Sequence, residues 1–206
     1  MGSSTARQPV FVITGTSGEG KSTLARRLVE RMPELELAVS ATTRPQRPGE
    51  VEGRDYWFIS EEEFDRRLAE NDFLEWVELP WGPGYRSGTL LSELERIRGE
   101  GRAPLLEVET TGALTVRDRV EGAVTIFVTA PSKEELEHRL RARATESEGE
   151  IDERLAVAEQ QLELESAFDH RIVNDDLERA FAELEEIVRS ELERAGTIPT
   201  RDPSPR

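Results

Sequence analysis

The residues best suited to chemistry lie in one glycine-rich loop near the N-terminus. Residues 15–22, GTSGEGKS, have the complete G-x-x-x-x-G-K-[ST] spacing. They follow an apolar segment at 10–13 and precede a helical stretch at 24–29, which is the strand–loop–helix order that this motif requires. Glycines let the backbone N–H groups point inward as an anion nest, and the start of the helix adds the positive end of its dipole. The loop therefore predicts a site for the phosphates of a nucleoside triphosphate.

Two side chains of this loop have specific roles in such a site. The chain has two lysines against 25 arginines, so Lys21 indicates a position that needs a compact ammonium rather than a planar fork. Lys21 can reach the β- and γ-phosphates, and Ser22 offers a hydroxyl to Mg²⁺. Glu19 places an acid in a loop built for anions, and we expect its side chain to face solvent.

A second polar block, residues 40–50 (SATTRPQRPGE), carries two arginines three positions apart among prolines. Arg44 and Arg47 would form a rigid cationic turn, and guanidinium groups match phosphate oxygens bidentately. Tyr56 could add a hydroxyl donor. The spacing alone also fits a proline-rich surface hairpin with ordinary arginines, so both interpretations stay open at this point.

Composition limits the partners. With a net charge of −16 over 206 residues, the chain is a poor match for nucleic acid, although a few arginines still suffice for small phosphates. The absence of cysteine excludes disulfides and thiolate chemistry, and two histidines leave little for a zinc site. The chain has no apolar run of 18 residues and no signal-peptide pattern at its start. We expect a cytoplasmic protein without a membrane partner.

The pattern of apolar residues predicts alternating elements, which are typical of a parallel α/β sheet. Strands are expected at 10–14, 37–41, 56–60, 73–79, 103–109, 123–130 and 170–174. Helices are expected at 21–31, 61–70, 89–99, 111–119, 133–143, 150–166 and 176–195, with capping boxes beginning at Ser60 and Ser132. The region 40–89 has short strands and turns, which indicates a β-rich lobe inserted between core segments 9–39 and 90–192. The tail 193–206 is expected to be disordered.

Several motifs in order along residues 9–192 resemble the guanylate kinase family. They include the glycine-rich loop, the block at 40–58 (SATTRPQRPGEVEGRDYWF) and FLEW at 73–76. LLEVE at 105–109, the segment 131–145 with Arg139 and Arg143, and VNDDL at 173–177 continue the match. The resemblance implies a P-loop NTPase fold: a parallel sheet flanked by helices, an acceptor-binding lobe at 40–89 and a helical lid at about 139–155.

The resemblance also implies an ATP-dependent nucleoside monophosphate kinase that moves the γ-phosphoryl group of ATP to GMP, with Mg²⁺ as cofactor. The catalytic residues implied are Lys21, Arg44, Arg143 and Arg154. The ATP-binding residues implied are Gly15, Ser17, Gly18, Gly20, Lys21, Ser22, Thr23, Arg139 and Asn174, with Ser22 also on the metal. The acceptor-binding residues implied are Ser40, Arg44, Arg47, Tyr56, Glu75, Tyr85, Ser87, Glu107 and Glu109. Small nucleotides would be the partners, with the protein a monomer or a homodimer.

The expected role of Glu75, with Ser40, is to read guanine. A carboxylate only accepts hydrogen bonds, and guanine presents two adjacent donors, N1–H and the 2-amino group. Adenine would place an acceptor opposite Glu75, and an unpaired buried polar group is how large discrimination arises.

Three departures from the family pattern lie on the acceptor side. The loop 80–89 is longer and adds Trp81 and Arg86, Glu107 and Glu109 replace the usual aspartates, and Thr111 replaces a glutamine. They allow neutral drift or an acceptor that is a modified purine nucleotide. Guanylate-kinase-like modules that bind phosphopeptides without catalysis are a further alternative, although they tend to lose the loop that is intact here. A sugar-phosphate kinase on this fold would not need Glu75.

Overall fold

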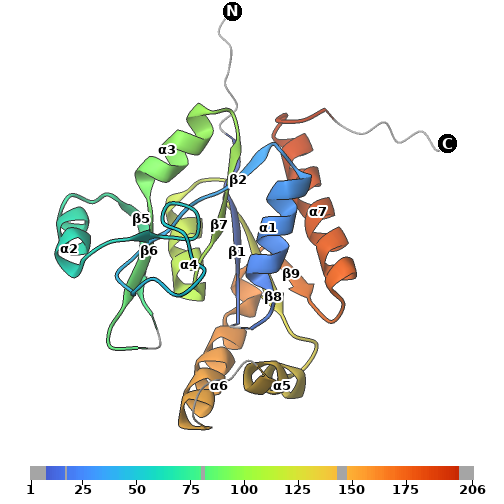
Figure 1. Ribbon diagram of the computed structural model, residues 1–206. Helices are drawn as coiled ribbons and strands as arrows, with labels where there is room; N and C mark the ends of the chain where they lie inside the picture. The colour runs from blue at the N-terminus through green and yellow to red at the C-terminus, as the bar shows by residue number, and fades with distance from the viewer. Residues whose placement is uncertain (1–7, 17, 80–81, 143–147, 200–206) are drawn as a thin grey trace, which may run out of the picture.

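The computed structural model describes residues 8–16, 18–79, 82–142 and 148–199, arranged around two sheets (Figure 1). The larger sheet is parallel, with strand order β2-β7-β1-β8-β9. Its strands are β1 (Phe11–Gly15), β2 (Leu35–Leu37), β7 (Ala103–Glu107), β8 (Val124–Thr129) and β9 (His170–Val173). In register, Phe11 of β1 lies opposite Leu105 of β7 and Val124 of β8. The predicted parallel α/β sheet is therefore confirmed.

Both faces of this sheet are buried, as its apolar strands require. On one face, Phe11 and Ile13 of β1 pack against α1 (Lys21–Arg31) and α7 (Leu177–Arg194). On the other, Val12 packs with α3 (Leu91–Gly99) and α4 (Thr110–Arg119). The phosphate-binding loop thus leaves the central strand and enters a helix that is anchored along the core.

The smaller sheet has the order β4-β3-β6-β5, formed by β3 (Ala41–Thr42), β4 (Trp57–Phe58), β5 (Phe73–Glu78) and β6 (Arg86–Leu90). Helix α2 (Glu61–Ala69) covers it through Phe64, whose ring stacks on Phe73 with centroids 4.4 Å apart. In α4, Arg119 donates to the carbonyl oxygens of Phe73 and Leu74, which joins this sheet to the core.

Beyond β8, α5 (Lys133–Ala142) and α6 (Glu148–Glu163) lie together below the large sheet in Figure 1, followed by a short 3₁₀ turn (Glu165–Ala167). Two predicted caps are present: Ser60 accepts from the N–H of Glu63 at 3.1 Å, and Ser132 from that of Glu135 at 3.2 Å. Within the described residues, no helix is both long and apolar enough to span a bilayer.

The structure differs from the predicted elements in three places. The expected strand 37–41 is two strands, because the chain leaves the large sheet after Leu37 and joins the small sheet at Ala41. Strand β6 was missed, and the helix expected from residue 89 begins at Leu91. Of the tail expected to be disordered, residues 193–194 belong to α7 and Ile198 packs against the core, while 200–206 lie outside the described residues.

Candidate functional site

The glycine-rich loop has three glycines with positive φ, Gly15, Gly18 and Gly20, a backbone that favours glycine. Gly15 has φ 134°, and a Cβ there would lie 2.0 Å from the carbonyl oxygen of Val128. Gly20 has φ 77° and forms the N-cap of α1. This geometry brings the loop close to β8 and directs its end toward the start of the helix, where the dipole favours an anion. Of the predicted loop residues, Ser17 lies outside the described residues.

The two functional side chains at the start of α1 are already engaged by protein oxygens. The Lys21 ammonium donates to the carbonyl oxygens of Gly15 at 2.8 Å and Thr16 at 2.6 Å. The Ser22 hydroxyl donates to Glu107 Oε1 at 2.6 Å, which links the loop to the end of β7. Lys21 is thereby held beside the loop that it is predicted to serve.

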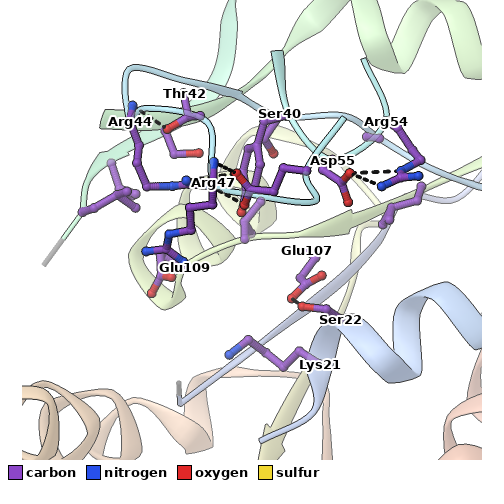
Figure 2. Close-up of a pocket in the computed structure, with 18 of the residues that line it drawn as sticks. Lys21, Ser22, Ser40, Thr42, Arg44, Arg47, Arg54, Asp55, Glu107 and Glu109 are labelled. Carbon is purple, nitrogen blue, oxygen red and sulfur yellow. Dashed lines mark hydrogen bonds and ion pairs between the residues drawn. The ribbon is translucent and has the colours of Figure 1, made fainter. Parts of the chain in front are cut away.

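These side chains open onto a pocket of about 340 Å³ that also reaches the small sheet (Figure 2). It brings together most of the predicted acceptor residues with the end of the phosphate-binding loop. The predicted residues that line it are Lys21, Ser22, Ser40, Arg44, Arg47, Tyr56, Glu75, Ser87, Glu107 and Glu109. Tyr85 and Thr23 are not among the lining residues, and the ring of Tyr85 lies against Gly82 instead.

Arg44 is the most buried of the cations that line the pocket. It is 8% exposed, and its guanidinium binds both oxygens of Glu50, at 2.7 and 3.1 Å. It also lies over the ring of Tyr56, 5.2 Å from the centroid. Burial acts to raise the pKa of Glu50, but hydrogen bonds from Arg44 and from the N–H of Arg47 lower it below its ordinary value. The cationic turn is therefore closed by its own carboxylate, a partner that the sequence analysis did not assign.

Glu75 is the buried acid of the pocket, 2% exposed, and one of its oxygens accepts from the N–H of Thr89 at 2.8 Å. A Cβ at Gly112 would lie 2.4 Å from the other oxygen, so only glycine leaves it room. Burial raises the pKa of Glu75 to about 7, and the nearby charge of Glu109 acts in the same direction. The site thus holds a carboxyl group with one oxygen fixed by the backbone.

Glu109 is a second glutamate that lines the pocket. It occupies the N-cap position of α4 without a side-chain capping hydrogen bond, and burial raises its pKa. Gln161 of α6 donates to its carboxylate at 3.1 Å, a contact between distant segments that no sequence pattern indicated. The end of β7 and the start of α4 therefore supply two carboxylates, Glu107 and Glu109, facing the cations.

An ion pair connects α1 with the small-sheet lobe beside the pocket. Arg26 of α1 contacts Asp55 of the small-sheet lobe at 2.5 Å, and Asp55 also accepts from the N–H of Val51 at 2.8 Å. Arg26, Asp55 and the neighbouring Arg54 and Thr42 all line the pocket but were not predicted as site residues. Asp55 stands in the quoted motif at 40–58, which was the available signal.

The position of Glu19 differs from the prediction. Glu19 is not turned to solvent but is 1% exposed, and its carboxylate pairs with Arg139 at 3.1 Å. Asn174 donates to the carbonyl oxygen of Glu19 at 2.7 Å. The predicted residues Arg139 and Asn174 thus lie beside the loop but do not line the pocket. Arg143 lies outside the described residues, and for Arg154 only the backbone, in α6, is described.

The acceptor-side departures have different structural outcomes. Arg86 pairs with Glu61 and Asp65 and lies over the ring of Phe64, so it braces α2 against the small sheet rather than lining the pocket. Thr111 is exposed on α4. Trp81 lies outside the described residues. Glu107 and Glu109 are the departures that do line the pocket.

The loop between the central parallel strand and its helix places the chain among P-loop α/β proteins. A guanylate kinase family model matches residues 7–191. The chain is 48% identical over 183 residues to a guanylate kinase of Rubrobacter xylanophilus, covering 89% of this chain and 94% of the relative. A guanylate kinase of Symbiobacterium thermophilum is 44% identical over 185 residues, covering 90% and 86%. The chain belongs to the guanylate kinase family.

A solved structure agrees with this assignment. The crystal structure of guanylate kinase from Anaplasma phagocytophilum superposes with a TM-score of 0.72 at 28% identity, covering 94% of this chain and 97% of that one. The similarity extends over both sheets of the present fold.

The raised pKa of Glu75 predicts a pH dependence of stability. The folded state keeps this proton up to about pH 7, whereas the ordinary value is 4.5, so its contribution to the free energy of unfolding falls as pH rises through that interval. In Glu75→Gln this loss, on the order of 3 kcal/mol, should be absent. Chemical denaturation of both proteins at several pH values measures it.

The matched control is Glu78→Gln, which changes an exposed glutamate of the same strand and should keep the wild-type pH dependence. If Glu75→Gln and the wild type lose stability in parallel between these pH values, Glu75 does not carry the buried proton.

Proposed function

We propose that this protein is an ATP-dependent kinase that transfers the γ-phosphoryl group of ATP to GMP, giving ADP and GDP. The observation that carries the proposal is one pocket with three distinct features. The pocket is lined by Lys21 of the glycine-rich loop, Arg44 of the cationic turn and the buried acid Glu75. A donor phosphate, an acceptor phosphate and a guanine base each have a chemically matched place.

The acceptor half fits a nucleoside monophosphate. Arg44 is preset by Glu50, so its fork loses little freedom on binding a phosphate, and the exposed Arg47 adds a second charge. One oxygen of Glu75 is held by the N–H of Thr89. In its ionised form the carboxylate accepts the two adjacent donors of guanine, and Ser40 supplies a further polar contact. We assign Tyr56 and Ser87 to the same site.

The residues also fit a magnesium ion. Ser22 and Glu107 offer hydroxyl and carboxylate oxygens side by side, which are the hard ligands that Mg²⁺ prefers together with phosphate and water. When bound, the ion would neutralise charge on the phosphates of the donor. We propose that Ser22 ligates it and that Glu107 orients Ser22.

The protein's own part in the reaction is positioning. The attacking oxygen of a nucleotide phosphate is already ionised, so no strong general base is needed. Lys21 stabilises charge on the transferring group, and Arg44 aligns the acceptor phosphate for in-line attack. We propose Arg143 and Arg154 as further cations carried by a lid at about 139–155, which excludes water on closing.

A modified purine acceptor gains no support from Arg86 or Thr111, and Glu107 and Glu109, which do line the pocket, keep the carboxylate groups of the usual aspartates. Arg86 braces α2, and Thr111 lies on the exposed side of α4. A phosphopeptide module would not require the intact Lys21 and Ser22. GMP is therefore the acceptor that this site fits best.

The direct test is a panel of nucleoside monophosphates supplied with ATP and Mg²⁺. GMP should be phosphorylated with the highest kcat/KM, because only guanine pairs both of its donors with Glu75. Coupled detection of ADP, with product nucleotides resolved by chromatography, measures it. Faster turnover of another nucleotide would replace GMP as the acceptor, and no turnover of any member would leave a binding module.

Lys21→Ala should lower kcat for GMP by about a hundredfold or more, because it removes a charge that acts on the transferring group. The fold should persist, as circular dichroism and thermal unfolding would show. Lys133→Ala is the matched control, since it removes the chain's other lysine, which pairs on the surface with Glu159. Activity that survives in Lys21→Ala would rule out this role.

Glu75→Ala should reduce the preference for GMP over AMP by about a hundredfold, since the pocket no longer opposes an acceptor atom of adenine with a carboxylate. The ratio of kcat/KM for the two nucleotides is the readout. Glu78→Ala, on the same strand, should keep the wild-type ratio. An unchanged ratio in Glu75→Ala would remove Glu75 from base recognition.

A further inference from the structure

The buried carboxylate of Glu19 is out of keeping with a loop that binds polyphosphate. Its side chain has no solvent exposure, and Arg139 supplies the ion pair at 3.1 Å. A buried acid without a cation would repel the phosphates that the loop exists to hold, and leaving a buried charge unpaired is strongly destabilising. Arg139, with the nearby charge of Lys21, therefore offsets the cost of keeping Glu19 in the loop.

Arg139 joins three separate segments through one guanidinium. Besides Glu19 it donates to the carbonyl oxygen of Asn174, after β9, at 2.9 Å. Its Nε donates to Glu135, one turn earlier in α5, at 2.7 Å. The side chain of Asn174 closes the set by donating to the carbonyl oxygen of Glu19 at 2.7 Å. The phosphate loop, α5 and the segment after β9 thus share one polar junction.

The junction also contacts the backbone of the loop. A Cβ at Gly20 would lie 2.9 Å from Nδ2 of Asn174, so the loop and the amide are in close contact. Gly20 is the N-cap of α1 and immediately precedes Lys21. Any shift of Glu19 relative to Asn174 would therefore be transmitted to the first turn of α1.

We propose that Glu19 is a positioning residue for the donor nucleotide: through Arg139 it fixes the phosphate loop against α5 before ATP binds. This inference rests on the proposed function, because it takes the loop as the ATP site. Arg139 then acts by neutralising and orienting Glu19. Neither Glu19 nor Arg139 lines the pocket that contains the predicted acceptor residues. Loss of this ion pair should therefore weaken the binding of ATP and leave that of GMP nearly unchanged.

The proposal predicts how substitutions of Arg139 and Glu19 change the binding of ATP. Arg139→Gln strands the Glu19 carboxylate beside the phosphates and should weaken ATP binding by more than about tenfold. Glu19→Gln in the same chain removes that charge, so the double variant should bind ATP better than Arg139→Gln alone, but less well than the wild type because the loop is no longer fixed to α5. Arg139→Lys keeps the charge but loses the fork, and should fall between the wild type and Arg139→Gln.

The experiment measures the dissociation constant of a non-hydrolysable ATP analogue by calorimetry for the wild type, the single variants and the double variant. KM for ATP and for GMP are measured beside it. Arg141→Gln is the matched control, because it breaks a similar i,i+4 pair with Glu137 on the exposed side of α5. Thermal unfolding of each variant accompanies the titrations.

Rescue of analogue binding in the double variant, with KM for GMP constant, supports the proposal. A defect of Arg139→Gln that Glu19→Gln does not rescue would overturn it, since Arg139 would then contact the nucleotide directly. Unchanged analogue binding in every variant would also overturn it, leaving the pair a structural one. The binding readout does not depend on the acceptor, so failure of GMP turnover alone would count against the proposed function and not against this junction.

Discussion

Several cations at and beside the pocket are held by protein oxygens, and the arrangement of the site depends on this compensation of charge. The chain carries a net charge of −16, yet its site is suited to polyanions. Lys21 rests on two loop carbonyls, Arg44 on Glu50, and Arg139 on Glu19. Because each partner belongs to the protein itself, the cations are positioned before any nucleotide arrives, which reduces the ordering cost of binding. An acidic protein can thus present positioned cations for phosphate groups without an excess of basic residues.

The glycine-rich loop is anchored on the large sheet, and the cationic turn lies on the smaller sheet, which is connected to the core by specific contacts. The loop grows out of β1, which is buried between β7 and β8, so its position is fixed by the core. The cationic turn belongs to the smaller sheet, which reaches the core through Arg119 of α4 and the Arg26–Asp55 ion pair. Glu75 stands where the two sheets meet, against Gly112 of α4. The proposed acceptor site therefore depends on the contact between the smaller sheet and the core rather than on either part alone.

The sequence was informative where function imposes a local pattern. The loop spacing predicted the turn between β1 and α1, the apolar run at 123–130 predicted β8, and two capping boxes predicted helix starts. The sequence did not predict the features that depend on a partner far away in the chain. Strand β6 contains Gly88 and a short polar run, and it is a strand only because β3 and β5 flank it. Glu19 was expected in solvent because Arg139, 120 residues later, is invisible to local reasoning.

The central claim is that a donor and an acceptor nucleotide meet phosphate to phosphate within one continuous site. A ligand with adenosine and guanosine at the two ends of a pentaphosphate chain tests this most directly. The account predicts that it binds with one molecule per chain, more tightly than ATP or GMP, and competes with both in calorimetric displacement. Competition with only one of the two nucleotides would contradict a shared site and with it the proposed transfer.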